Sequence, residues 1–266
     1  PSLRQDADRA GAGRKTLLLI GDNSFCNRTI FRSQCERLEI LARARKDIRL
    51  CHRAEPGSRA FYDPLKFTPE QVRQDESLVW RKARVFYGGQ WRKLRYKVLS
   101  PVWWQSGSGR RPVRLIVLAP IPYQPPGRRR KYYRDSAYLL TTDLQASPGE
   151  LIQMSLAPWQ NEVNHREEKD TLGVGQAQLR SVQSVPRQPA FVVAAYSALL
   201  LAALLAFGPD RTSVFQPLPK WRKNASRPSC LDLVTLLRRQ MQDKSGELPS
   251  HPCRLAPHTM VLGADA

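Results

Sequence analysis

The sequence lacks the cysteine and histidine patterns that zinc sites require. Its five cysteines are scattered, no Cys-x-x-Cys pair occurs, and none of its four histidines is separated from another by three to five residues. A structural zinc site is therefore not expected, because such sites are built from closely spaced cysteine and histidine ligands. The odd number of cysteines also favours reduced thiols in a cytoplasm over a framework of disulfides.

Two other features are missing from the N-terminal part of the chain. No secretory signal opens it, because the apolar run at 17–20 is too short and is followed by polar Asp22 and Asn23. Residues 11–16 lack the G-x-x-x-x-G-K-[ST] spacing of a phosphate-binding loop, and they precede a predicted strand instead of following one. The chain begins with Pro1 and not with Met, so we expect further sequence upstream.

Acidic residues are few relative to basic ones. The chain of 266 residues has 43 Lys and Arg against 23 Asp and Glu, which gives a formal net charge of +20 and a pI of about 10.4. So large an excess predicts a polyanionic partner, either nucleic acid or an anionic membrane surface. The length is sufficient for one good hydrophobic core with an inserted subdomain.

One long stretch has no charge at all. Residues 189–207 form an apolar run that would measure about 28 Å as a helix, just enough to span a bilayer. A single-span membrane protein is therefore one hypothesis. Alanine and serine fill eight of the 19 positions, which is weakly hydrophobic for a span. A buried helix of an α/β core has the same composition, and we favour that interpretation, with these side chains packed against the sheet: Phe191, Val192, Tyr196 and Leu199.

Residues 78–143 are predicted to form an antiparallel β subdomain. Their hydrophobic pattern has a period of two, and Gly88-Gly89 predicts a hairpin turn between strands at 79–87 and 93–98. In the second strand leucine, tyrosine and valine share one face, while the other face carries Lys93, Arg95 and Lys97.

The cations of this subdomain have two interpretations. Besides the strand face there is a basic run that consists of Arg128, Arg129, Arg130 and Lys131, and several tryptophans are interleaved with the cations. The pattern indicates a surface that binds nucleic acid, and it is equally compatible with a merely solvated face of the sheet.

Asp22 directly follows a predicted strand. Residues 17–20 are apolar on both faces, as in the middle of an α/β sheet, and a second strand is predicted over 39–50. Open α/β sheets place their chemistry just beyond the carboxyl ends of strands, which makes Asp22 a candidate site residue. An Asx turn explains the same aspartate equally well on local grounds.

A polar helix is predicted from Trp159 onward. Neither proline nor glycine occurs between Trp159 and Gly173, which is expected to end the helix. Glu162, Arg166 and Lys169 are spaced i, i+4, i+7 and share one face. Such a face suits a metal-bound acid beside nucleic-acid phosphates. The alternative, which spacing alone favours, is an exposed face held by Glu–Arg and Glu–Lys pairs worth a few tenths of a kcal/mol each.

The order of residues in this helix resembles a known family. The segment 159–169, W-Q-x-E-V-N-x-R-E-E-K, is similar to the signature of DDE-type insertion-sequence transposases, in the branch with Tyr, Arg, Glu and Lys around the third catalytic acid. The segment 21–29, G-D-x-S-F-x-N-R-T, resembles the same family at its second catalytic aspartate. The two motifs stand in the family's order, and the resemblance covers roughly residues 16–242.

The resemblance implies an α/β fold with a ribonuclease-H-like core over 16–208, interrupted by the β subdomain at 78–143 and followed by a C-terminal helix and tail at 209–266. It implies an N-terminally truncated transposase catalytic domain that cleaves and transfers DNA strands at transposon ends with Mg²⁺ or Mn²⁺. Asp22 and Glu162 would be its catalytic metal ligands, and Arg166 and Lys169 would hold phosphates. The family's first catalytic aspartate is expected upstream of this chain, so the triad within it is incomplete.

The implied partner is duplex DNA, both transposon ends and target, with a homodimer on the DNA as an option, no membrane, and a bacterial cytoplasm with nucleoid association. Where the family carries Tyr and Arg before the third acid, this chain has Ser155 and Pro158. These departures leave a second hypothesis open, a non-catalytic DNA-binding remnant of a transposase. The single-span membrane protein is the third.

Overall fold

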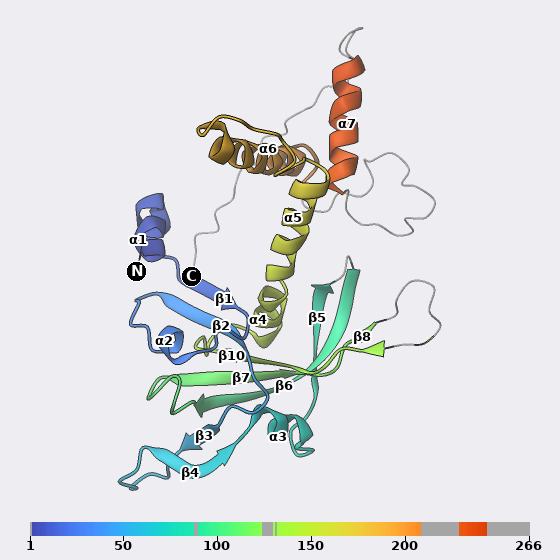
Figure 1. Ribbon diagram of the computed structural model, residues 1–266. Coiled ribbons are helices and arrows are strands. Elements are labelled where there is room, and N and C mark those ends of the chain that lie inside the picture. The colour runs from blue at the N-terminus through green and yellow to red at the C-terminus, as the bar shows by residue number, and fades with distance from the viewer. Residues whose placement is uncertain (1, 88–89, 124–129, 131, 209–228, 244–266) are drawn as a thin grey trace, which may run out of the picture. The chain divides into compact units, whose positions relative to one another are not determined.

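The computed structural model describes residues 2–87, 90–123, 130, 132–208 and 229–243 (Figure 1). The chain is a mixed α/β protein with an open, mixed sheet of eight strands, which confirms the predicted α/β class. It divides into two compact units, Pro1–Gln160 and Asn161–Ala266, whose positions relative to one another are not determined.

The sheet lies in the first unit. Its strands are β1 (Leu17–Gly21), β2 (Leu38–Ala44), β3 (Leu50–Arg53), β4 (Tyr62–Phe67), β5 (Arg81–Tyr87), β6 (Gln90–Trp103), β7 (Pro112–Leu118) and β10 (Ala137–Thr141). Their order is β1-β2-β10-β7-β6-β3-β4, and β5 pairs with β6. β1 and β2 are parallel, and the other described pairings are antiparallel. Two short strands, β8 (Pro122–Tyr123) and β9 (Tyr132–Tyr133), pair with one another.

Short helices surround this sheet, and longer ones make up the second unit. The first unit contains α1 (Ser2–Ala7), which continues into a π-helical turn η1 (Asp8–Ala12), and α2 (Arg28–Phe31), α3 (Pro69–Gln74) and α4 (Pro148–Ser155). α5 (Pro158–Asp170) begins at the end of the first unit, and the second unit also holds α6 (Ser184–Phe207) and α7 (Cys230–Asp243).

Both faces of the central strands are covered. Along β7, Leu115 and Val117 belong to one apolar cluster, and Ile116 and Leu118 belong to another. The first cluster includes Phe31 of α2 and Val72 of α3, while the second includes Leu151 and Ile152 of α4. Residues 115–118 of β7 therefore form an uninterrupted apolar run, because successive side chains point into two different cores.

Two predicted boundaries differ from the structure. The strand expected at 39–50 is two strands, β2 and β3, separated by a turn in which Arg45 binds Asp47 through two hydrogen bonds. The antiparallel strands expected as a subdomain at 78–143 continue the sheet of β1 and β2, because β10 pairs directly with β2. The predicted hairpin of β5 and β6 is present, with Tyr87 opposite Gln90, and its Gly88-Gly89 turn lies outside the described residues.

In the second unit one buried tyrosine joins two helices. The Tyr196 hydroxyl of α6 donates a hydrogen bond to Glu167 Oε2 of α5 at 2.7 Å and lies 3.1 Å from Asn164 Oδ1. The prediction that Phe191 is buried is wrong, since its side chain is 74% exposed, and Val192 and Leu199 are only half-buried. The packing of α6 against the sheet stays a prediction, because the two belong to different compact units.

A candidate nucleic-acid interface

The β5–β6 hairpin has one apolar face and one basic face. Its register places Lys82 opposite Arg95 and Arg84 opposite Lys93. All four side chains are exposed, and we call them the basic hairpin face. On the other side, Ala83, Val85, Leu94 and Tyr96 are buried in the core cluster that α4 completes. The alternation predicted from the sequence is therefore realised for Lys93 and Arg95, and β5 contributes two further cations that the prediction did not include.

The charges of the basic hairpin face repel one another. Like charges directly opposite across two strands destabilise a sheet. None of the four cations forms an ion pair with any residue in the described part of the chain. The Arg84 guanidinium instead lies 4.9 Å from the Trp91 ring centroid, and that of Arg95 lies 5.6 Å from the Trp80 ring. Each such contact contributes about 0.5–1 kcal/mol at an exposed site.

Helix α4 holds the outer edge of the hairpin in place. The Phe86 backbone N–H donates to Gln153 Oε1 at 2.7 Å, and Gln153 Nε2 donates to the Phe86 carbonyl at 3.3 Å. α4 itself begins with a capping box in which Ser147 and Glu150 satisfy one another's backbone N–H groups. The edge strand thus has a fixed partner close to its tip, and the four cations sit on an ordered support.

Lys97 does not belong to the basic hairpin face, and its predicted contact with nucleic acid is wrong. Its side chain is 2% exposed, and its ammonium group donates to the carbonyls of Val72, Arg73 and Asp75 at 3.4, 2.9 and 2.5 Å. α3 covers this stretch of β6, and the cation binds the carbonyl groups at the C-terminal end of that helix. Of the predicted basic run, Arg130 is exposed, and Arg128, Arg129 and Lys131 lie outside the described residues.

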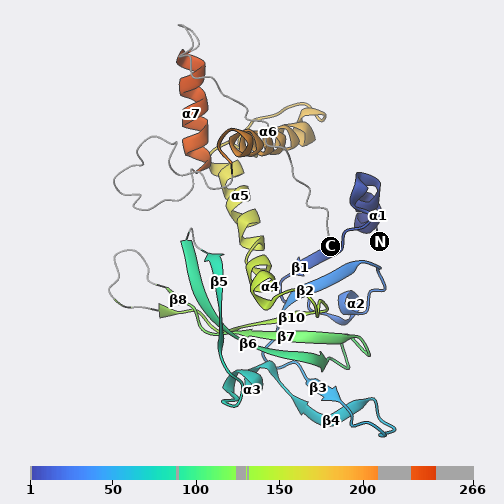
Figure 2. The same ribbon diagram turned by 180° about the vertical axis from the view of Figure 1, so that it is seen from behind.

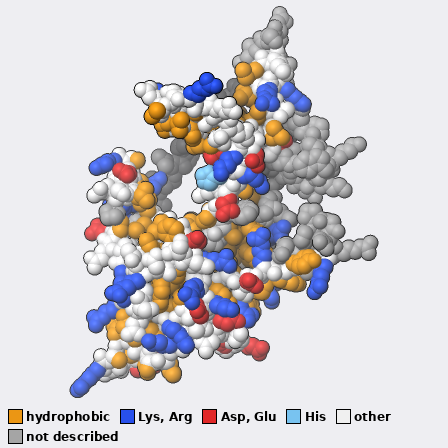
Figure 3. All heavy atoms as spheres, in the orientation of Figure 1, with side chains coloured by type: hydrophobic (Ala, Val, Ile, Leu, Met, Phe, Trp, Pro, Cys, Tyr) orange, Lys and Arg blue, Asp and Glu red, His pale blue; other side chains and the backbone are white. Residues whose placement is uncertain are grey.

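Cations are also spread beyond the hairpin. Figure 3 shows Lys and Arg side chains over the lower part of the view, where β3, β4 and β6 lie. This distribution agrees with the formal net charge of +20.

Asp22 directly follows β1, as predicted. Its Oδ1 accepts hydrogen bonds from the Ser24 hydroxyl at 2.6 Å and from the Ser24 backbone N–H at 2.9 Å. These bonds, that of the hydroxyl first, lower the pKa of Asp22 below its ordinary value, so the exposed carboxylate stays ionised. Gly21 is required before it, because a Cβ at Gly21 would lie 2.3 Å from the Phe25 side chain. The Asx turn is thus confirmed, and a site at Asp22 stays a prediction.

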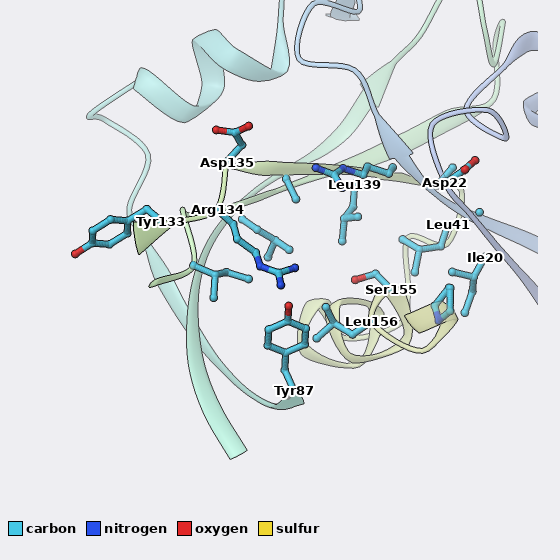
Figure 4. Close-up of a pocket in the computed structure, with 17 residues that line it drawn as sticks. Ile20, Asp22, Leu41, Tyr87, Tyr133, Arg134, Asp135, Leu139, Ser155 and Leu156 are labelled. Carbon is cyan, nitrogen blue, oxygen red and sulfur yellow. The ribbon is translucent and has the colours of Figure 1, made fainter. Parts of the chain in front are cut away.

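A cavity of about 710 Å³ adjoins Asp22 (Figure 4). Its lining combines the end of β1 with Tyr87, Arg134, Ser155 and Pro158, the first residue of α5. Arg134 points into the cavity, with its guanidinium 5.8 Å from the Tyr87 ring centroid. The carboxylates of Asp22 and Asp135 point away from one another (Figure 4).

Among the described residues of the first unit, Asp22 stands without two further metal-ligating side chains beside it. Mg²⁺ requires oxygen ligands in octahedral geometry, and two-metal sites hold their ions about 3.5–4 Å apart. Within the described residues no group of three or more His, Cys, Asp and Glu side chains could hold a metal ion. Asp22 is the one predicted ligand that this unit provides.

Glu162, Arg166 and Lys169 lie on an exposed face of α5. At about 100° per residue this face is opposite to Asn164 and Glu167, which contact Tyr196. Glu162 forms no ion pair with Arg166, Lys169 or another described residue, so the exposed face held by Glu–Arg and Glu–Lys pairs is not realised. Glu162 and Asp22 belong to different units, and their approach stays a prediction.

Lys82 and Arg84 were the main residues that sequence reasoning missed. Their signal was present, because cations alternate with Ala83 and Val85 in the first strand of the hairpin as they do in the second. Comparison with protein-family models and with curated proteins finds no match to this chain.

Proposed function

We propose that the protein binds duplex DNA through the basic hairpin face. The observation that carries the proposal is the placement of Lys82 opposite Arg95 and of Arg84 opposite Lys93 without an acidic partner in the described chain. A polyphosphate backbone neutralises all four charges, and release of the counterions from the DNA drives the association. The free hairpin bears the repulsion, which DNA binding relieves.

The same geometry indicates contacts with the backbone and not with particular bases. The cations lie on one face of a two-stranded hairpin, and lysine and arginine contacts with phosphates position a protein without reading sequence. Trp91, 59% exposed at the edge of this face, offers a ring on which an unpaired base can stack. We therefore expect the protein to bind any duplex and to prefer duplexes that have frayed ends or nicks.

The test is a salt titration of binding to a labelled duplex of about 20 base pairs. Replacing the four cations by glutamine should lower the slope of log affinity against log salt by about 3 to 4, because each lost phosphate contact removes about 0.9. A control variant with the same change in charge replaces four exposed arginines elsewhere, Arg14, Arg28, Arg238 and Arg239. Equal slopes for the two variants would contradict the proposal.

The proposed activity on this DNA is strand cleavage and transfer, with the first unit as the ribonuclease-H-like core of a DDE-type transposase and β5–β10 as its insertion. Two observations support this activity. Asp22 is an ionised carboxylate at the carboxyl end of a parallel strand, and Glu162 is exposed and forms no ion pair with described residues. These two residues would hold Mg²⁺ or Mn²⁺, together with further ligands.

Metal binding can be measured without activity. A calorimetric titration of the protein with Mn²⁺ should show binding of the ion. The substitutions Asp22→Asn and Glu162→Gln should each weaken this binding. Duplex binding that persists while no Mn²⁺ binds would instead identify a non-catalytic DNA-binding remnant. The matched control is Asp6→Asn, since Asp6 is an exposed carboxylate that is paired with Arg9 and is not a candidate ligand.

A second candidate function, attachment to a membrane, is favoured by α6. This helix of 24 residues is long and apolar enough to cross a bilayer, and 6% of its most apolar 18-residue window is buried. Exposed leucines along it include Leu201, Leu204 and Leu205. Fractionation with a carbonate wash tests the candidate, because a spanning helix stays with the membranes and a helix packed against protein does not.

A further inference from the structure

We infer a second phosphate-binding site at the opposite end of the same sheet, which contacts the same DNA and therefore rests on the proposed function. Figures 1 and 2 show the β3–β4 and β5–β6 hairpins at opposite ends of the sheet, with β6 running between them. β6 has 14 residues. At 3.3 Å per residue, such a strand spans roughly 45 Å. The inferred site is a hollow of about 470 Å³ lined by residues 53–61 and by Arg110.

The loop that forms this hollow has a defined shape. Ser58 N–H donates to the Glu55 carbonyl at 3.1 Å, with Pro56 and Gly57 between them. Gly57 has φ of 93°, which is the conformation that the third position of a type II turn requires, and proline is favoured at the second position. Ala54 N–H donates to the Phe61 carbonyl at 3.1 Å and joins the two ends of the loop.

Two arginines of the hollow stack on one ring. The guanidinium carbons of Arg53 and Arg110 lie 5.4 and 5.2 Å from the Phe61 ring centroid. Phe61 contacts Trp103 edge to face, with ring centroids 6.1 Å apart, and Trp103 Nε1 donates to the Arg110 carbonyl at 3.2 Å. Trp103 is buried, so the ring and the backbone of Arg110 both rest on the core. We call Arg53, Arg59 and Arg110 the arginine clamp.

The arginine clamp has the chemistry of a phosphate site. A guanidinium that stacks by its face leaves its N–H edge available, and that edge donates two parallel hydrogen bonds to a phosphate. The hollow contains three arginines and a single acid, Glu55, and none of these four forms an ion pair with another described residue. The three cations therefore line one hollow, and none of them is paired with a described carboxylate.

A nucleic-acid backbone is the ligand that fits both the chemistry and the position. The hollow is larger than one phosphate group, so it admits a phosphodiester with its neighbouring sugars. The hollow and the basic hairpin face adjoin different ends of β6, which has a register shift between Leu99 and Val102. A long polyanion is the ligand that contacts both.

The test is a titration with a labelled duplex of about 20 base pairs. It compares a variant that removes two cations from the hollow with a variant that removes its acid. Arg53→Gln with Arg110→Gln should lower the affinity roughly tenfold and the log–log salt slope by about 1.8, because two phosphate contacts are lost. Glu55→Gln should raise the affinity severalfold, since it removes the one acid of the hollow. Arg53→Lys with Arg110→Lys should give an intermediate loss, because it keeps the charge and removes the paired donors.

Controls separate the possible outcomes. Arg14→Gln with Arg28→Gln changes the net charge equally outside the hollow, and thermal midpoints check that each variant folds. If the wild type binds no duplex at low salt, the proposed function fails with this inference. A second outcome is that the wild type binds duplex, the basic hairpin variant loses affinity, and the clamp variants bind as well as the control. In that case the proposed function stands and only this inference is wrong. Competition by millimolar inorganic phosphate as effective as competition by unlabelled duplex would also overturn it, because the site would then bind a free anion.

Discussion

Lys93 and Lys97 stand four residues apart on β6 and on the same side of its alternation, yet the structure places them in opposite environments. Lys93 is exposed opposite Arg84 and forms no ion pair with another described residue. Lys97 is buried and donates to three carbonyl groups at the end of α3. The comparison teaches that alternation determines which face of a strand a cation occupies, whereas the element packed on that face determines whether the cation meets solvent.

The largest expected effect is on the free energy of unfolding, and it concerns the buried Lys97. Lys97→Met keeps the apolar stem and removes the ammonium, which leaves buried carbonyl groups without a donor, so we expect the free energy of unfolding to fall by about 2–3 kcal/mol. Lys93→Met, at an exposed position, should change it by less than about 0.5 kcal/mol. Chemical denaturation of both variants measures the difference. Equal effects would show that burial does not distinguish the two lysines.

The helix that covers Lys97 depends on a second contact, between Glu70 of α3 and the sheet. Hydrogen bonds from Arg73, and then from Tyr138 of β10, lower the pKa of Glu70 to about 2 from an ordinary 4.5. A lowered pKa stabilises the fold above pH 4.5, and this contribution is lost as the pH falls through 2. We expect Glu70→Gln to cost about 1–2 kcal/mol at pH 7.

The pH dependence of unfolding tests this assignment directly. Between pH 4.5 and 2 the wild type should lose more stability than Glu70→Gln, and the two curves should converge at the acid end. Parallel curves over that range would show that Glu70 does not hold α3 on the sheet.

The same contrast between buried and exposed side chains occurs in α6. Tyr196→Phe removes the hydroxyl that binds Glu167, and we expect a loss of about 1 kcal/mol in the stability of the second unit. Phe191→Ala, at a side chain that is 74% exposed, should have almost no effect on stability in solution. Hydrogen exchange of the α5 and α6 amides separates these outcomes. A larger effect of Phe191→Ala would indicate a partner for the apolar face of α6.

The smallest expected effect is a gain in stability instead of a loss, and it concerns the exposed Lys93. Lys93→Glu converts a like-charge pair with Arg84 into an opposite-charge pair, so we expect the hairpin to gain about 0.2–1 kcal/mol. The same change should weaken DNA binding, whereas Lys93→Gln should fall between the two in both measurements. Denaturation and duplex titration on the same samples check this pair of opposite effects, and a loss of stability would contradict the cross-strand repulsion.

Local sequence signals predicted several features of the fold and the candidate site correctly. The apolar run before Asp22 is β1, the alternation after residue 90 gives β6 its buried and exposed faces, and the helix with Glu162 ends before Gly173. Gly173 has φ of 77°, which explains why glycine stands there. These features depend on backbone preferences and on the period of a single element, and both are present in the sequence of that element.

What the sequence by itself determined is therefore the type of each strong element and the face on which its cations lie. The tertiary structure alone decided that α3 covers Lys97, that β10 joins the antiparallel strands to β2, and that Phe61 brings Arg53 and Arg110 together. Each of these three facts joins residues that are far apart in the chain. Such contacts arise from the packing of whole elements, since burial of apolar surface is non-directional and no local pattern specifies which partner supplies it.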